Sequence, residues 1–114
     1  MPDDNKDNKN VFVRISGILN YDMQKRFIEV VNILNNNGYK IKTIHLKDVD
    51  GGFIKVGSYI GSFVSQNKLN VIASGECHSS CHLIFMFGKY RMADRKSIFG
   101  FHGYRDKPEA KRKI

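Results

Sequence analysis

The first half of the chain alternates β-rich and helical segments, and this alternation limits the folds open to it. Val11 to Ser16 and Tyr39 to Leu46 are rich in β-branched and aromatic residues, which favour strands. Between them, apolar residues recur at helical spacing from Tyr21 to Asn36, where Asn20 or Asp22 can cap the start. A strand, a helix and a strand within about 36 residues predict a right-handed βαβ unit with parallel strands.

The second half continues the pattern. A second helix is expected from Phe53 to about Asn67, with glycines that permit close packing, and a third strand from Asn70 to Ser74. An apolar helix is expected from about Ser79 to Phe87, and short strands at Tyr90 to Ala93 and Ser97 to His102. The order β-α-β-α-β-α-β-β predicts an α/β layered domain with a mainly parallel sheet.

The length of 114 residues allows one domain with a real core. Residues 1–10 offer almost nothing to bury and are expected to form a disordered arm, residues 11–104 the α/β domain, and residues 105–114 a basic tail. The net charge is +8, but the basic residues are scattered and no aromatic stripe accompanies them, so a nucleic-acid partner is not expected. The chain has no apolar run of membrane-spanning length and no signal core, which predicts a cytoplasmic protein.

One stretch of the chain, Gly75 to Gly88, places a small polar turn between an apolar strand and an apolar helix. The turn reads Cys77-His78-Ser79-Ser80-Cys81. A strand-to-helix turn is a place where a serine can be lifted clear of a sheet with backbone N–H groups pointing outward. Polar residues at the mouth of a buried helix are costly without partners, so this turn is a candidate functional site.

Three features of the sequence are expected at the same edge of the sheet. Gly51 and Gly52 follow the second strand, Cys77 to Ser80 follow the third, and His102 ends the last. Ligands of such sheets bind outside the carboxyl ends of the strands. Residues distant in sequence would therefore meet there, as a catalytic site requires.

Taken in order, these motifs resemble the Clp protease proteolytic subunit within the Clp/crotonase superfamily. They are similar in particular to a Clp-like group, often predicted to be exported, with a Cys-x-Ser-x-Cys nucleophile motif. The resemblance runs from about Val11 to Tyr104. It rests on Asp50-Gly51-Gly52 before a helix, on Cys77 to Cys81 at the nucleophile turn, and on Arg91 followed by Phe99-Gly100-Phe101-His102.

The resemblance implies a serine hydrolase that acts on a peptide or another acyl substrate. Ser79 would be the nucleophile and His102 the general base, and the N–H groups of Gly52 (or Gly51) and Ser80 would form the oxyanion hole. No cofactor is implied.

The acid that orients the family's histidine comes from a later segment than this chain contains, because the chain ends at Ile114. A truncated reading frame or a minimal, inactive relative is therefore expected. Self-association, or a partner that covers the missing half, is expected too, with an exposed apolar patch at that place.

Each candidate residue also has a purely structural interpretation. Ser79 can be a helix N-cap, His102 a partly buried histidine with a backbone partner, and Gly51 and Gly52 a tight turn. In that case the chain would be a non-catalytic binding or assembly module with the same fold.

The Cys/His cluster of the turn leaves a third alternative open. The cluster contains two overlapping pairs at the four-residue spacing of helical zinc ligands, Cys77 with Cys81 and His78 with His82. Cys77 followed by Cys81-His82 also resembles a haem attachment motif that is one residue longer than usual. The two pairs point about 100° apart on a helix, so they cannot easily converge on one ion. The alternative is that both cysteines are buried packing residues, with reduced thiols, because a disulfide between two residues on one helical face would be distorted.

Overall fold

The computed structural model describes residues 9–94 and 98–100, and it confirms the predicted order of elements. Residues 1–8 of the predicted arm, His102 and the basic tail lie outside the described residues, while Asn10, predicted as part of the arm, begins β1. The elements are β1 (Asn10–Leu19), α2 (Tyr21–Asn36), β2 (Lys40–Gly52), α3 (Ile54–Gln66), β3 (Asn70–His78), α4 (Cys81–Met86), β4 (Arg91–Ala93) and β5 (Ile98–Gly100).

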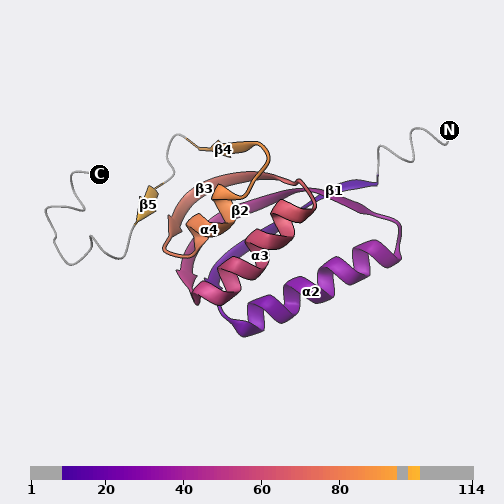
Figure 1. Cartoon of the computed structure of the whole chain (residues 1–114), viewed down its shortest axis with the longest axis horizontal. Coiled ribbons are helices and arrows are strands. Elements are labelled where there is room, and N and C mark those ends of the chain that lie inside the picture. The colour runs from indigo at the N-terminus through magenta and orange to yellow at the C-terminus, as the bar shows by residue number, and fades with distance from the viewer. Residues whose placement is uncertain (1–8, 95–97, 101–114) are drawn as a thin grey trace, which may run out of the picture.

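All strand pairs of the described sheet are parallel, as predicted. The sheet order is β1-β2-β3-β4, and β5 also pairs with β3. Two short strands therefore share one side of β3, β4 beside its first half and β5 beside its last three residues. Figure 1 shows α2 and α3 running along the sheet, with the short α4 close to the end of β3.

One face of the sheet carries the core and is covered by helices. Val13, Ile44 and Val71 share a register position across β1, β2 and β3, and alternate residues along each strand face the helices with them. Phe27 of α2 and Phe63 of α3 meet edge to face, with ring centroids 5.3 Å apart. The buried apolar residues of the strands and helices form one cluster. This packing accounts for the α/β layering, because each element buries its apolar side against the next layer.

The opposite face of the sheet remains exposed. Its apolar side chains include Phe12, Ile72 and Met92, which are 60%, 37% and 66% exposed. Phe12 and Ile72 alternate with more buried residues along β1 and β3, so they point away from the helices, and Met92 of β4 is paired with Ile72. That the patch expected beside the missing segment lies on this face stays a prediction.

The helix boundaries follow from local chemistry. The Asn20 side chain accepts a hydrogen bond from the N–H of Met23 at 2.9 Å, which caps α2 at the predicted position. In α3, Gly61 gives room to Phe87, whose ring would lie 2.6 Å from a Cβ atom there. The sequence predicted close packing at this glycine, and the structure shows that the partner is the segment of α4. Within the described ranges, no helix is long and apolar enough to cross a membrane.

Three boundaries at the candidate site differ from the prediction. β2 continues past Leu46 to Gly52, so Gly51 and Gly52 end this strand and do not follow it. β3 continues past Ser74 to His78, and α4 begins at Cys81 rather than at Ser79. Ser79 and Ser80 therefore lie in a two-residue turn between a strand and a helix. The apolar residues of this segment predicted a longer helix. The helix has only six residues, in which Cys81 and Ile84 are fully buried.

Candidate active site

Ser79 occupies a backbone conformation that is uncommon for a residue with a side chain. Its φ is +53°, in the left-handed region, directly after β3 and before α4. Such a conformation costs about 1 kcal/mol or more for an L-residue, and its occurrence in a strand-to-helix turn is typical of nucleophile elbows. The N-cap interpretation of Ser79 is wrong, because the N-cap position of α4 is Ser80 and no side-chain hydroxyl caps the helix.

Gly51 lies against this turn, which confirms the expected meeting of the second and third strand ends. A Cβ atom on Gly51 would lie 2.7 Å from the His78 carbonyl oxygen and 2.9 Å from Ser79 Cβ. Any side chain at position 51 would therefore push the turn away. The glycine is needed at this place for close approach as well as for its φ of +96°.

Ser80 packs below the turn against α3. It is 2% exposed, and a Cβ atom on Gly57 would lie 2.7 Å from its carbonyl oxygen. The Ser80 hydroxyl is buried without a hydrogen-bond partner among the described residues. The side chain therefore acts as a small packing group, while any catalytic role of this residue would belong to its backbone N–H.

Cys77 and Cys81 form a disulfide, whereas reduced thiols were expected for two cysteines on one helical face. Their Cα atoms are 5.4 Å apart, an ordinary separation for a disulfide. That expectation applied only if both cysteines faced the same side of a helix, and this condition is not met. Cys77 belongs to β3 and Cys81 to α4, so the bond crosses the turn that contains Ser79.

The Ser79 carbonyl is held by two donors from His82. The His82 backbone N–H lies 3.0 Å from this oxygen, and the ring Nδ1 lies 2.9 Å from it. Because a carbonyl can only accept, Nδ1 carries the proton that it donates. Burial lowers the pKa of His82, the bond to Ser79 opposes this shift, and the nearby His78 lowers the pKa further. The neutral ring is thus favoured in the folded protein.

An irregularity in the pairing of β2 and β3, which was not predicted, changes the direction of the end of β3. Asp48 has a φ of +51°, and its Oδ1 accepts a hydrogen bond from the Glu76 N–H at 3.0 Å. The carboxylate also fills the space in which a Cβ atom of Gly75 would lie. The register between β2 and β3 shifts here, so that Lys47 pairs with Ser74 but Val49 with Cys77. Such bulges redirect strands at functional sites.

The predicted base, His102, lies outside the described residues, and its contact with Ser79 remains a prediction. The preceding strand is described: β5 pairs with the last three residues of β3, and Gly100 is opposite His78. Gly100, two residues before His102 in the sequence, is therefore paired with the residue that directly precedes Ser79.

A hydrogen-bonded serine–histidine pair does occur elsewhere in the sheet. His45 Nε2 lies 2.8 Å from Ser74 Oγ on the exposed face. Partial burial and the positive charges of Arg14 and Lys47 lower the pKa of His45. Ser74 lies within β3, without the positive φ or the turn of Ser79. This pair is therefore a useful comparison for the candidate nucleophile, rather than a second elbow.

The disulfide-bonded protein lacks the two thiolates that the proposed metal site would use as ligands. A metal ion binds a thiolate, whereas the sulfur atoms of Cys77 and Cys81 are bonded to each other. His78 Nε2 lies 2.9 Å from Glu76 Oε1, in an exposed pair. In the part of the chain that the structure describes, no group of three or more His, Cys, Asp or Glu side chains could hold a metal ion.

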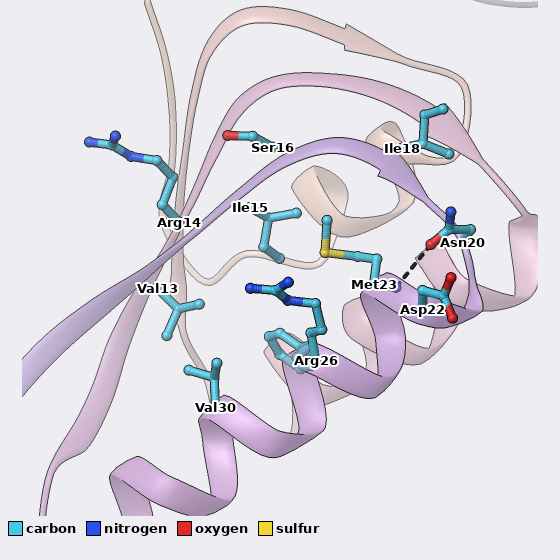
Figure 2. Close-up of a pocket in the computed structure, with 11 residues that line it drawn as sticks. Val13, Arg14, Ile15, Ser16, Ile18, Asn20, Asp22, Met23, Arg26 and Val30 are labelled. Carbon is cyan, nitrogen blue, oxygen red and sulfur yellow. Dashed lines mark hydrogen bonds between the residues drawn. The ribbon is translucent and has the colours of Figure 1, made fainter.

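A cavity of about 580 Å³ lies between β1 and α2, away from the turn. Figure 2 shows Val13, Ile15 and Val30 on its walls, and the guanidinium of Arg26 lying across the space between them. None of the predicted site residues lines it. This cavity is therefore separate from the candidate active site.

Comparisons with known proteins identify the fold. No protein-family model and no curated protein matches the chain. Among solved structures, the chain is similar to the ClpP protease catalytic domain of Plasmodium falciparum, with a TM-score of 0.66 and 17% identity over 94% of this chain and 62% of that one. It is also similar to ClpP1 of Listeria monocytogenes, with a TM-score of 0.63 and 13% identity over 98% of this chain and 68% of that one.

A third similar structure is a mutant of the 1510-N membrane-bound stomatin-specific protease. The TM-score is 0.61 and the identity 14%, over 79% of this chain and 45% of that chain. The chain therefore has the ClpP-like α/β fold and spans roughly half to two thirds of these neighbours.

Proposed function

We propose that this protein is a Clp-like serine hydrolase that cleaves a peptide or a related acyl substrate through Ser79. The observation that carries the proposal is the left-handed turn of Ser79, with a φ of +53°, pressed against Gly51. A strained serine between a strand and a helix has no structural advantage over glycine. A serine at this position is explained when its hydroxyl is needed for chemistry.

The proposed oxyanion hole consists of the backbone N–H groups of Gly52 and Ser80. The Leu19 carbonyl accepts its hydrogen bond from the N–H of Phe53, at 2.9 Å. Because successive N–H groups of a strand alternate between its two neighbours, the Gly52 N–H is expected on the side of β3 and the Ser79 turn. The Ser80 N–H makes no hydrogen bond within the described residues and can face the same position.

His102 is the proposed general base. In the first step it would take the proton of Ser79 while the hydroxyl oxygen attacks the carbonyl carbon, and the two N–H groups would stabilise the oxyanion. The protonated histidine would then donate to the leaving amine, and water would hydrolyse the acyl-enzyme by the reverse sequence. The register of Gly100 opposite His78 supports this assignment.

A fluorophosphonate probe, which reacts with activated serines, tests the proposal. We expect one adduct per chain, located on Ser79 by peptide mass spectrometry. The Ser79→Ala variant should not react, and His102→Ala should react at least about 100-fold more slowly. Ser74→Ala is the matched control, because it removes the other serine that is bonded to a histidine, and it should react like the wild type. No adduct on folded protein, or an adduct that persists in Ser79→Ala, would refute the proposal.

A second candidate function is a non-catalytic assembly module, and the exposed sheet face favours it. Phe12, Ile72 and Met92 form an apolar surface that association with a second copy of the chain would cover. If the protein self-associates, Ile72→Lys should shift its mass in analytical ultracentrifugation toward that of the monomer. The probe experiment decides between the two candidate functions, because a non-catalytic module would give no adduct on Ser79.

A further inference from the structure

The disulfide joins the two elements that bracket Ser79. Cys77 lies near the end of β3, where it pairs with Val49 of β2, and Cys81 is the first residue of α4. Both are almost completely buried, at 1% and 0% exposure. Ser79 lies midway between them in the chain, so the bond closes a small ring that contains the strained residue.

This ring has a local effect rather than a global one. The cysteines are four positions apart, and a disulfide that closes so short a loop restricts the unfolded chain much less than one that closes a long loop. In the folded protein, however, it ties the start of a six-residue helix directly to the end of a strand. The backbone between them can therefore relax very little.

We propose that the Cys77–Cys81 disulfide holds Ser79 in its reactive conformation, so that the oxidised protein is the active form. The inference rests on the proposed function above, and the two cysteines are positioning residues. When the bond is absent, the Ser79 turn is held mainly by its carbonyl, which accepts from the N–H and the ring of His82. The φ of Ser79 can then relax to a negative value, which turns its hydroxyl and the following N–H away from the substrate.

The redox step is defined by its chemistry. A phosphine reductant attacks one sulfur and breaks the S–S bond, and water supplies the oxygen of the phosphine oxide and the two protons of the thiols. Disulfides persist in oxidising compartments. The inference therefore favours an exported location for the active protein, in place of the cytoplasmic location expected from the N-terminus.

The test compares the labelling kinetics of oxidised and reduced protein. The chain has two cysteines, so tris(2-carboxyethyl)phosphine has one disulfide to reduce, and the mass gain of two hydrogens confirms it. We expect the maximal rate of Ser79 phosphonylation to fall on the order of 100-fold. The probe concentration at half-maximal rate and the final stoichiometry should stay the same, because the turn moves while the fold remains. Partial unfolding would lower the stoichiometry instead.

A variant and a second readout complete the experiment. The double variant Cys77→Ala/Cys81→Ala should react as slowly as the reduced wild type and should not respond to the phosphine. Oxidised glutathione, added to the reduced wild type, should return its labelling rate to that of the oxidised protein. Amide hydrogen exchange at His82, whose N–H bonds to Ser79, should accelerate on reduction, while that of Ile60 in α3 should not.

Two different failures can be told apart. Equal labelling rates in the oxidised, reduced and double-variant proteins would overturn the positioning role and leave Ser79 as the nucleophile. No labelling in any state would refute the proposed hydrolase. In that case, unchanged exchange at His82 on reduction would also refute the effect of the disulfide on the turn, whereas faster exchange would support it.

Discussion

Two strand-to-helix turns meet at the candidate site, and they solve the same problem differently. The turn at the end of β2 uses Gly51 and Gly52, the last two residues of this strand, with φ values of +96° and +139°. The turn after β3 uses Ser79 at +53°, bracketed by a disulfide and by two hydrogen bonds from His82. Glycine adopts such angles without steric cost, so the first turn needs no additional stabilising bond. The disulfide and the hydrogen bonds stabilise the second turn, in which a residue with a side chain occupies a conformation that favours glycine.

The largest effect is expected where the two turns touch. Gly51→Ala adds a methyl group 2.7 Å from the His78 carbonyl and should lower the free energy of unfolding by about 3 kcal/mol. Gly17→Ala is the matched control, because Gly17 has a φ of +87° but no atom within 4 Å of the added methyl. It should cost only about 1 kcal/mol. Urea denaturation measures both, and equal losses would contradict the close contact of the turns.

The next largest effect belongs to the disulfide. The double variant Cys77→Ala/Cys81→Ala should lose about 2 kcal/mol of unfolding free energy, as expected for a short closed loop. The measurement is urea denaturation without reductant. A much larger loss would mean that the disulfide stabilises the whole fold. It would then contradict the view that the bond serves mainly to stabilise the Ser79 turn.

The strain of Ser79 itself can be measured with a pair of substitutions. Ser79→Gly should be more stable than Ser79→Ala by about 1 kcal/mol, because glycine removes the left-handed penalty. At Ser74, which lies within β3, the order should reverse, because glycine weakens a strand by about 0.5 to 1 kcal/mol relative to alanine. Thermal or urea unfolding gives both differences. The same order at both positions would show that Ser79 is not strained.

The smallest effect concerns pH and His82. Since its pKa is lower in the folded than in the unfolded protein, the folded state binds fewer protons, and stability should decline as pH falls below about 6.5. His82→Asn keeps an N–H donor near the Nδ1 position and removes the titration, so its unfolding free energy should fall less between about pH 7.5 and pH 5.5. His82→Ala should lose about 1 kcal/mol at neutral pH, because the Ser79 carbonyl loses one donor. Parallel pH curves for the wild type and His82→Asn would exclude this contribution.

The parts of the fold that depend on local patterns were predictable. The bounds of α2 agree with its apolar periodicity and its Asn20 cap, and the parallel sheet follows from the alternation of strands and helices. The ends of β2 and β3 were predicted too early, because their last residues include glycines and polar side chains that do not resemble a strand. Their pairing with neighbouring strands keeps them extended, and that pairing is not visible in one segment.

The details of the site depended on contacts between distant residues. The glycine pair and the serine turn were predicted to meet, and Gly51 does contact Ser79. The hydrogen bond from Glu76 to Asp48 joins two strands whose register shifts at that point, so no local pattern predicts it. The disulfide was missed because the four-residue spacing was considered only for two cysteines on one helical face, whereas Cys77 lies in β3 and Cys81 begins α4.

The pH dependence of Ser79 labelling tests the central claim most directly. We measure the rate of fluorophosphonate labelling for oxidised wild type and for His102→Ala across the range in which an imidazole loses its proton. The account predicts that the wild-type rate rises through this range, and that His102→Ala reacts at least about 100-fold more slowly without the rise. Equal rates for the two proteins, or a wild-type rate that does not change with pH, would contradict an activated serine at this turn.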